Sequence, residues 1–396
     1  MESETQSTSP PSDPAIALAP PPPGPEQFRF TGDGGEYFRI WIVNIALTIL
    51  TLGIYSAWAK VRRLQYFYRH TEVAGASFDY HGKPLAILYG RIVALALVLV
   101  YQASNHISIA AAFVGLVVLC VVLPWLLRNA LRFRMRYSSY RGLRFSFRAS
   151  NADAYATFLP FGLFALVFLG LSAWAFNGEL ARDPDAMDKS KSIAFAAGAG
   201  LVGLIYMALV PLLYQRLKQF QHGKAWFGQT PFSFSAAPRP FYAIYGRAAL
   251  MMVGILVLIF ALMILAAMLG KAVGQSAAVF VLIAPIYLLA FVALGAYVAA
   301  RLGNLVWNST MLGQHRFEST LAMKPLMWIQ ISNVLLVLLT VGFYLPWAMV
   351  RLARYRAENL SLIPAAPLED FLSSSEGDVG AVGEETLDMF DFDIGL

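Results

Sequence analysis

Two stretches of the chain carry nearly the same unusual string, TLGIYSAWAKVR at residues 51–62 and TVGFYLPWAMVR at residues 340–351. Seven of the twelve positions are identical: Thr, Gly, Tyr, Trp, Ala, Val and Arg. The candidate motif residues are Thr51, Gly53, Tyr55, Trp58 and Arg62 in the first copy, and Thr340, Gly342, Tyr344, Trp347 and Arg351 in the second. Each copy lies at the end of an apolar segment of about twenty residues. The structural role of the string therefore depends on whether that segment crosses a membrane.

The composition is that of a membrane protein, because 58% of the 396 residues are hydrophobic and only 14% are charged. Soluble domains carry about 25% charged residues. All Lys and Arg residues lie within residues 27–356, whereas residues 1–26 and 357–396 carry only acidic charges. A basic middle can indicate nucleic-acid binding. Here the bases cluster beside the ends of apolar runs, which favours basic cytoplasmic loops and no nucleic-acid partner.

Six apolar runs are long enough to cross the hydrocarbon core of a bilayer. They cover approximately residues 87–104, 107–127, 155–176, 193–214, 248–269 and 277–300. Their interiors carry no Asp, Glu, Lys or Arg. Cytoplasmic loops collect Lys and Arg, so the connections and both termini are predicted on the cytoplasmic side. The connections so placed are residues 60–91, 128–150, 216–247 and 301–326.

The segments that hold the repeated string, residues 40–59 and 328–349, raise a conflict if they span. The second is followed by RLARYR, whose bases would then lie outside. The conflict disappears if each segment enters from the cytoplasm, bends at Gly53 or Gly342 and returns. Short apolar helices suit such re-entrant segments, Gly permits the bend, and a Thr hydroxyl can satisfy a freed carbonyl. The alternative is eight spans with both termini outside.

Four connections contain a Gly followed by alternating aromatic or apolar residues, which is the pattern of a β-hairpin. They are GASFDY at 75–80, GLRFSF at 142–147, GQTPFSF at 228–234 and GQHRFES at 313–319. The helices that follow begin alike in two places, AILYGR at 86–91 and AIYGR at 243–247. We therefore predict an all-α polytopic membrane protein with about six transmembrane helices, two repeated re-entrant segments, small cytoplasmic β-hairpins and an internal repeat.

These motifs resemble one known family. The stretch FTGDGGEYFRIWIVNIALTILTLGIYSAWAKVRRLQYF at 30–67, followed by TEVAGASFDYHGKPLAILYGR at 71–91, is similar to the YjgN family of bacterial inner-membrane proteins. The resemblance covers approximately residues 27–360. It implies a bacterial inner-membrane location. Because the family is defined by a domain of unknown function, the resemblance implies no activity, cofactor or site residue.

Three regions follow from the composition. Residues 1–26 form a Pro-rich N-terminal segment that is predicted to be disordered, and residues 27–360 form the membrane domain. Residues 361–396 form an acidic C-terminal tail that is also predicted to be disordered. Each tail is either a solvated extension or a partner-binding segment.

Catalytic, cofactor and metal motifs are absent from the sequence: it has no phosphate loop, no HExxH, no GxSxG and no Cys/His cluster with zinc spacing. We therefore expect no enzyme activity, no cofactor and no metal. Polar residues near the membrane are the remaining candidates. We predict a candidate vestibule formed by Arg91, Arg247, Asn44 and Asn333.

The arginines and asparagines of this vestibule allow several interpretations. The arginines Arg91 and Arg247, with those that end the two repeated strings, would attract anions, hold anionic lipid headgroups or simply anchor helices by snorkelling. Asn44 and Asn333 would line a shared polar point or satisfy the bent backbone locally. The paired Tyr and Trp of the strings suit interface packing better than a binding cage.

The functional hypothesis is permeation or transport of a small molecule or ion without an intramembrane charge relay. The alternative is a non-transporting scaffold or a lipid-interacting membrane protein. The expected partner is the lipid bilayer, with an anionic lipid or a small-molecule ligand as further possibilities. Substrate, coupling and oligomeric state are left open by the sequence.

Overall fold

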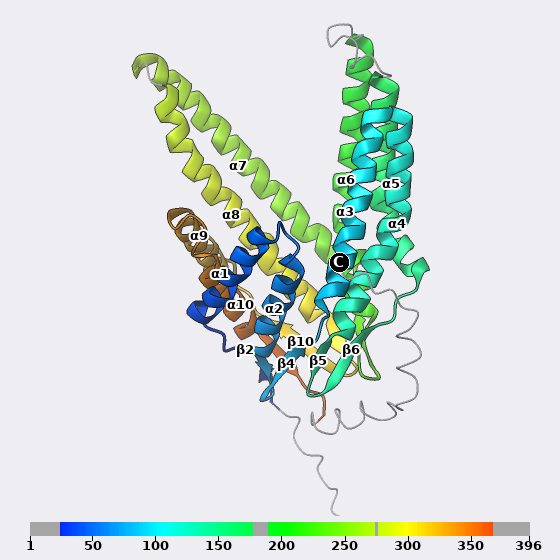
Figure 1. Cartoon of the computed structure of the whole chain (residues 1–396). Coiled ribbons are helices and arrows are strands. Elements are labelled where there is room, and N and C mark those ends of the chain that lie inside the picture. The colour runs from blue at the N-terminus through cyan, green and yellow to red at the C-terminus, as the bar shows by residue number, and fades with distance from the viewer. Residues whose placement is uncertain (1–23, 177–188, 274–275, 367–396) are drawn as a thin grey trace, which may run out of the picture.

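The computed structural model describes residues 24–176, 189–273 and 276–366. In this part of the chain, pairs of helices alternate with pairs of strands (Figure 1). The helices are α1 (Gly34–Leu50), α2 (Ser56–Arg69), α3 (Pro84–Ile107), α4 (Ile109–Arg136), α5 (Asn151–Phe176), α6 (Lys189–Gly223), α7 (Pro238–Val273), α8 (Ser276–Asn308), α9 (Met323–Leu339) and α10 (Leu345–Glu358). The strands are β1 (Glu26–Gln27), β2 (Arg29–Phe30), β3 (Thr71–Val73), β4 (Ala76–Tyr80), β5 (Ser138–Tyr140), β6 (Leu143–Phe147), β7 (Ala225–Phe227), β8 (Thr230–Phe234), β9 (Thr310–Leu312), β10 (His315–Ser319) and β11 (Leu360–Ile363).

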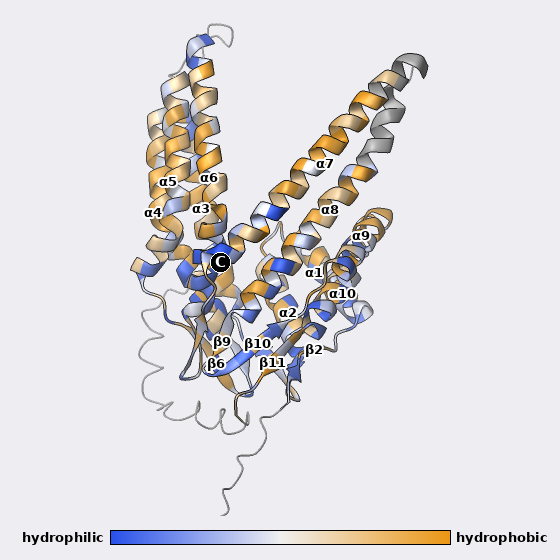
Figure 2. Ribbon diagram, turned by 180° about the vertical axis from the view of Figure 1, so that it is seen from behind, coloured by the Kyte–Doolittle hydropathy of each residue, from blue (hydrophilic) through white to orange (hydrophobic). Residues whose placement is uncertain are grey.

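Six of the described helices, α3 to α8, are long and apolar enough to cross a membrane, which agrees with the number of spans predicted from the sequence. Hydrophobic residues predominate along the coloured parts of these helices (Figure 2). Large side chains such as Met207, Leu250 and Phe260 point away from the rest of the protein and are largely exposed. Stable proteins do not leave large contiguous apolar surfaces open to water, and lipid chains are the natural cover for the surfaces of these six helices.

The described helices form five hairpins that rise from one side of the strands (Figure 1). Three hairpins, α3–α4, α5–α6 and α7–α8, are long. The other two, α1–α2 and α9–α10, are short, and we call them the first and the last short hairpin. Each helix contacts the next one along the chain, and α10 contacts α1. The helices therefore form a closed circuit in which the two short hairpins are neighbours.

The strands form one sheet in the order β1-β11-β10-β9-β8-β7-β6-β5-β4-β3-β2. The prediction of an all-α fold with separate small hairpins is therefore corrected, since β4 also pairs with β5, β6 with β7 and β8 with β9. The two edge strands, β1 and β2, are separated only by Phe28. Both edges of the sheet thus meet in one segment, and the sheet closes on itself. We call this closed sheet the strand ring; it leaves no long free edge for unwanted pairing.

The closure depends on the two ends of the described chain. Strand β11 pairs with β1, with Glu26 opposite Leu362, and with β10, with Ser319 opposite Leu360. The N–H of Phe28 donates to the carbonyl oxygen of Leu360 at 3.0 Å. An N-terminal strand and a C-terminal strand thus complete a fifth pair beside the four predicted hairpins, all four of which are present.

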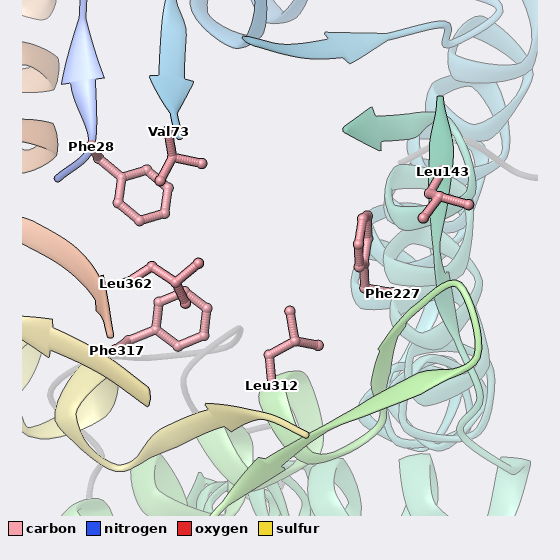
Figure 3. Packing of buried hydrophobic residues seen from close by; sticks show 7 residues of the cluster. All are labelled: Phe28, Val73, Leu143, Phe227, Leu312, Phe317 and Leu362. Atoms are coloured by element: carbon pink, nitrogen blue, oxygen red, sulfur yellow. The ribbon is translucent and has the colours of Figure 1, made fainter. Parts of the chain in front are cut away.

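The interior of the strand ring is filled by apolar side chains from strands around its circumference (Figure 3). The cluster comprises Phe28, Val73, Leu143, Phe227, Leu312, Phe317 and Leu362. Alternate residues of a strand point to the same face, so each strand pair supplies at least one inward residue to the cluster, and the pair β9–β10 supplies two. Burying one such aromatic or Leu side chain stabilises by about 1.5–3 kcal/mol.

Strand pairing also decides how the short hairpins relate to the membrane. Arg29 of β2 lies opposite Glu72 of β3, so the chain returns to its starting point after the first short hairpin. A single crossing by residues 40–59 would place these two strands on opposite sides of the bilayer. The pairing of β10 with β11 imposes the same condition on the last short hairpin. Both ends of each short hairpin therefore lie at the strand ring.

The strand ring extends slightly beyond both predicted boundaries of the membrane domain. Strand β1 begins at Glu26, and β11 continues to Ile363. The predicted C-terminal tail therefore loses residues 361–363 to the sheet. Residues 1–23 and 367–396, which make up most of the two predicted disordered segments, lie outside the described residues.

Closure of the strand ring predicts a specific cross-link. In a Cys120→Ser background, Gln27→Cys and Ser361→Cys should form a disulfide under mild oxidation, because these residues are direct partners in the sheet. The measurement is retention of an N-terminal and a C-terminal proteolytic fragment in one band until reductant is added. Gln27→Cys with Ser77→Cys is the matched control, since Ser77 pairs with Glu72 instead. Equal cross-linking of the two pairs would contradict the ring.

Candidate functional site

The two copies of the repeated string form the tips of the two short hairpins. In the first, α1 ends at Leu50 and α2 begins at Ser56, with the bend between them. Gly53 has φ +92° and Gly342 has φ +93°, in a region of backbone space that disfavours any side chain. The bend therefore lies at the two glycines that the sequence predicted.

The threonine of each string ties the bend together. The hydroxyl of Thr51 donates to the carbonyl oxygen of Leu47 at 2.7 Å and accepts from the N–H of Tyr55 at 2.9 Å. Thr340 makes the same two contacts in the last short hairpin, at 2.6 and 2.9 Å. The end of a helix leaves backbone groups without partners, and here one side chain bridges the end of one helix and the start of the next. The carbonyl oxygen of Leu47 also accepts from the N–H of Thr51 at 3.0 Å, so it is not a freed carbonyl as the sequence predicted. The contact particular to the bend is the one from the N–H of Tyr55 to the hydroxyl.

The aromatic residues of the strings pack within each tip. Tyr55 stacks on Trp58 with ring centres 6.0 Å apart and an interplanar angle of 12°. Tyr344 stacks on Trp347 at 5.9 Å and 16°. Offset stacking of this kind stabilises a pair by about 0.5–1.5 kcal/mol. The spacing of three residues places both rings on one side of the bend.

The arginines of the strings make local contacts that differ between the copies. The guanidinium of Arg62 lies over the ring of Tyr55, 5.8 Å from its centre. Arg351 instead donates from Nη1 to the hydroxyl of Ser332 at 2.7 Å, which ties α10 to α9. Most of the repeated string thus builds the short hairpins themselves.

A pocket of about 590 Å³ opens beside the first short hairpin, between α1, α2 and the start of α3. We call it the basic pocket. Its polar lining consists of Asn44, Thr48, Ser56, Lys60, Arg63 and Arg91. Its apolar wall includes Tyr37, Trp41 and Ile49.

The basic pocket concentrates positive charge without an acidic side chain in its lining. Burial lowers the pKa of the Lys60 amine, and the positive charges of Arg91, Arg134 and Arg63 lower it further. Arg91 reaches across from α3 and donates from Nη1 to the hydroxyl of Ser56. A lowered pKa means that the free protein disfavours the charged amine, and an anion in the pocket would relieve this repulsion.

The last short hairpin has a similar bend but a different lining. At a constant offset of 289 residues, the paired positions are Thr48 and Val337, Ser56 and Leu345, Lys60 and Met349, and Arg63 and Leu352. Each polar residue of the pocket in these pairs has an apolar counterpart. The last short hairpin therefore forms the same kind of bend without these polar residues, which only the first short hairpin carries.

The structure separates the four residues of the predicted vestibule. Arg91 and Asn44 line the basic pocket, whereas Arg247 and Asn333 do not. Asn333 donates from Nδ2 to the carbonyl oxygen of Ala348, 3.3 Å away, within its own hairpin. Arg247 is exposed near the start of α7.

Sequence reasoning did not select Lys60, Arg63 or Trp41, although all three line the pocket. Lys60 lies at a position where the two strings differ, and Arg63 directly follows the first string. Identical positions indicate the bend that both hairpins share. The positions of Lys60 and Arg63, which correspond to Met349 and Leu352, indicate what distinguishes the two hairpins.

The described residues contain no group of three or more His, Cys, Asp or Glu side chains arranged to hold a metal ion. The Lys, Arg and neutral polar side chains of the basic pocket can recognise negative charge. Arginine suits this task because its planar fork can contact two oxygens of a phosphate or carboxylate at once.

Helical hairpins with six long apolar helices, rising from one side of a strand ring, define a multi-pass integral membrane protein. The chain belongs to the family of bacterial proteins of unknown function designated DUF898, whose model matches residues 25–389. The match includes the region whose motifs resemble the YjgN family and continues beyond it.

Curated relatives support this assignment. Inner membrane protein YjgN of Salmonella typhimurium is 24% identical over 362 residues, which are 83% of this chain and 86% of the relative. Inner membrane protein YjgN of Escherichia coli O157:H7 is 29% identical over 208 residues, which are 51% of this chain and 50% of the relative. No solved structure matches the chain.

The backbone angle of the bend predicts unequal effects of two glycine substitutions. Gly53→Ala should destabilise the protein by about 1–2 kcal/mol, because a side chain disfavours a positive φ. Gly254→Ala is the matched control: both sites have open space for a methyl group, but Gly254 lies within helix α7. The measurement is the thermal unfolding midpoint of each variant in detergent. A Gly53→Ala midpoint at or above that of the Gly254→Ala variant would contradict the proposed importance of the bend.

Proposed function

We propose that this protein binds the headgroup of an anionic phospholipid in the basic pocket, at the membrane surface on the side of the strand ring. The observation that carries the proposal is the set of three cationic side chains, Lys60, Arg63 and Arg91, in a pocket whose lining holds no acidic residue. Basic pockets between membrane helices on the cytoplasmic side are suited to anionic lipid headgroups. The role is one of recognition, without enzyme chemistry.

The surroundings of the pocket favour a lipid over a soluble anion. Ile49 lines the pocket and is itself 69% exposed, and Leu52 at the tip is 95% exposed. Apolar side chains this exposed require a hydrocarbon environment or a partner. A phospholipid fits both the cationic pocket and the apolar tip, with its phosphate at the cations and its acyl chains along the tip.

The length of the first short hairpin supports insertion to partial depth. Helices α1 and α2 have 17 and 14 residues. At about 1.5 Å per residue they are roughly 26 and 21 Å long, shorter than a hydrocarbon core of about 30 Å. Their common attachment to the strand ring also requires entry and exit on one side. We infer that both short hairpins are re-entrant and that the five helical hairpins with their strand pairs are copies of one repeated unit.

Permeation of a small molecule or ion stays a prediction from the sequence. Arg91, at the start of α3, is the one residue of the pocket lining that comes from a spanning helix. A site built this way suits binding at the membrane surface better than passage between the spans. We therefore place lipid recognition before permeation.

The lipid-binding proposal predicts a charge-specific loss. Lys60→Met combined with Arg63→Leu introduces the residues that the last short hairpin already carries. Native mass spectrometry of the detergent-purified protein with dioleoyl phosphatidylglycerol and dioleoyl phosphatidylcholine should show preferential binding of the anionic lipid to the wild type. The double variant should lose at least tenfold in affinity for the anionic lipid, because each lost charge-assisted contact costs about 1.5–3 kcal/mol.

Arg247→Ala is the control, because it removes a positive charge that is exposed and outside the pocket. Its preference for the anionic lipid should equal that of the wild type. Equal binding of the anionic and the zwitterionic lipid to the wild type would refute the proposal.

We further propose that the strand ring lies in the cytoplasm, because the basic residues beside the spans lie on its side of the membrane. In a Cys120→Ala background, Ser77→Cys in β4 should react with a membrane-impermeant maleimide in inverted inner-membrane vesicles. It should remain unlabelled in intact spheroplasts. Labelling in spheroplasts would place the strand ring outside and reverse the orientation.

A further inference from the structure

The cations of the basic pocket are not balanced by an acidic side chain. Among the described residues, Lys60, Arg63 and Arg91 form no ion pair with a carboxylate. Helices α1, α2 and α3 line the pocket, and their sequences contain a single acidic residue, Glu36. Its carboxylate accepts from the Tyr66 hydroxyl at 3.2 Å and is not part of the lining. An anion that enters the pocket therefore meets three cationic side chains without competition from a carboxylate.

Two neighbouring features add to the positive potential. Burial lowers the pKa of the Lys60 amine, and the charge of Arg134 on α4 contributes to this lowering together with the two arginines of the lining. Helix α2 begins at Ser56, which lines the pocket, and its N-cap residue Tyr55 forms no side-chain cap. The N-terminus of a helix carries a partial positive charge. A single negative charge would therefore leave much of this potential uncompensated.

The hydrogen-bond donors of the pocket come from two facing helices. Ser56, Lys60 and Arg63 lie on one face of α2, because residues three and four apart in a helix are neighbours. Arg91 reaches across from α3 and donates to the Ser56 hydroxyl, whose own hydrogen is left to donate to a ligand. The pocket therefore suits a ligand with several negatively charged acceptor oxygens and no donor of its own.

A phosphomonoester meets these requirements better than a phosphodiester. It has three strong acceptor oxygens and a charge of roughly −1.5 to −2 at neutral pH. Esterifying one of those oxygens removes one acceptor and leaves a single negative charge. The doubly charged form gains more from the nearby cations, since each charge pair adds its own Coulomb term.

We propose, on the basis of the proposed lipid-binding function, that the basic pocket selects a lipid whose phosphate is a terminal, doubly charged monoester. Phosphatidate has this chemistry. Phosphatidylmethanol has the same acyl chains and differs only by a methyl ester on the phosphate, which removes the second charge. Lys60 is the specificity-determining residue, because the surrounding arginines all act on its amine and a dianion relieves their repulsion.

The test is a competition between the dioleoyl forms of these two lipids in native mass spectrometry of the full-length protein at two pH values. A phosphomonoester loses its second proton with a pKa of about 6, so phosphatidate is singly charged at about pH 5 and doubly charged at about pH 8. The wild type should prefer phosphatidate by at least about tenfold at the higher pH, because the second charge adds a Coulomb interaction with each cation. At the lower pH the preference should be less than about twofold, because the two lipids then carry equal charge.

The groups that face the pocket do not produce this pH dependence. They are Tyr37 from α1, Lys60 and Arg63 from α2, and Arg91 from α3, with Arg134 of α4 acting on Lys60. Burial raises the pKa of Tyr37 to about 12, and the lining contains no carboxylate or imidazole. Loss of the Lys60 proton at the higher pH would reduce the preference for the dianion, which is opposite to the expected change.

A single substitution tests the role of Lys60. Lys60→Met introduces the residue found at the equivalent position of the last short hairpin. It should reduce the preference for phosphatidate at the higher pH by at least about threefold, because one of the cations is lost. Arg247→Ala is the control, since it removes an exposed charge outside the pocket, and it should keep the preference of the wild type. An unchanged preference in the Lys60→Met variant would overturn the role of this residue.

The outcomes separate this inference from the function on which it depends. Equal binding of phosphatidate and phosphatidylmethanol to the wild type, with phosphatidylcholine weaker, would overturn the selection of a monoester and leave anionic-lipid binding intact. A preference for phosphatidate that persists at the lower pH would overturn it too, because the size of the headgroup would then be the cause. Equal binding of all three lipids would overturn both proposals. Displacement of phosphatidate by an equimolar amount of free glycerol phosphate would overturn the choice of a lipid as the source of the monoester. The wild-type comparison does not depend on whether any variant folds.

Discussion

The pairing of the N-terminal strand segment with the C-terminal strand β11 is the constraint on which the rest of the structure depends. It brings Glu26 beside Leu362 and closes the strand ring, so that both edges of the sheet end in the segment around Phe28. Once the ring is closed, every helical hairpin begins and ends on the same surface. The arrangement of long spans and short hairpins, including the contact of α1 with α10, follows from that shared base.

The two short hairpins show how one local structure can carry two roles. Both have the same Thr bridge, the same glycine with positive φ and the same Tyr–Trp stack. Because these contacts hold each tip together, the residues of the facing helix surfaces are free to differ. The last hairpin fills those positions with Met349 and Leu352, whereas the first places Lys60 and Arg63 there and leaves a pocket. The residues that are identical in the two hairpins form the bends, and residues that differ line the candidate site.

The parts of the fold that were predictable depend on local patterns. The four strand pairs follow from a Gly before alternating residues; in the first, Ala74 and Gly75 both adopt the positive φ of a tight hairpin turn. The joining of these hairpins into one ring was missed, because each interface pairs strands of three to five residues that are distant in sequence. Strand β1 has two residues and carries no recognisable pattern. Half of the predicted vestibule lines the basic pocket, since helix spacing alone does not tell which side chains face one another.

The sequence by itself determined the class of protein, the six spans and the bends at Gly53 and Gly342. Long uncharged apolar runs have few stable environments other than a bilayer. A glycine two residues after a Thr and two before a Tyr specifies its own turn through contacts within a few residues. The tertiary structure alone decided that the hairpins form a closed ring, that both ends of each short hairpin lie at that ring, and that Asn44 lines a cationic pocket while the side chain of Asn333 bonds within its own hairpin. These features depend on contacts between residues far apart in the chain, whose partners are fixed only when the whole ring assembles.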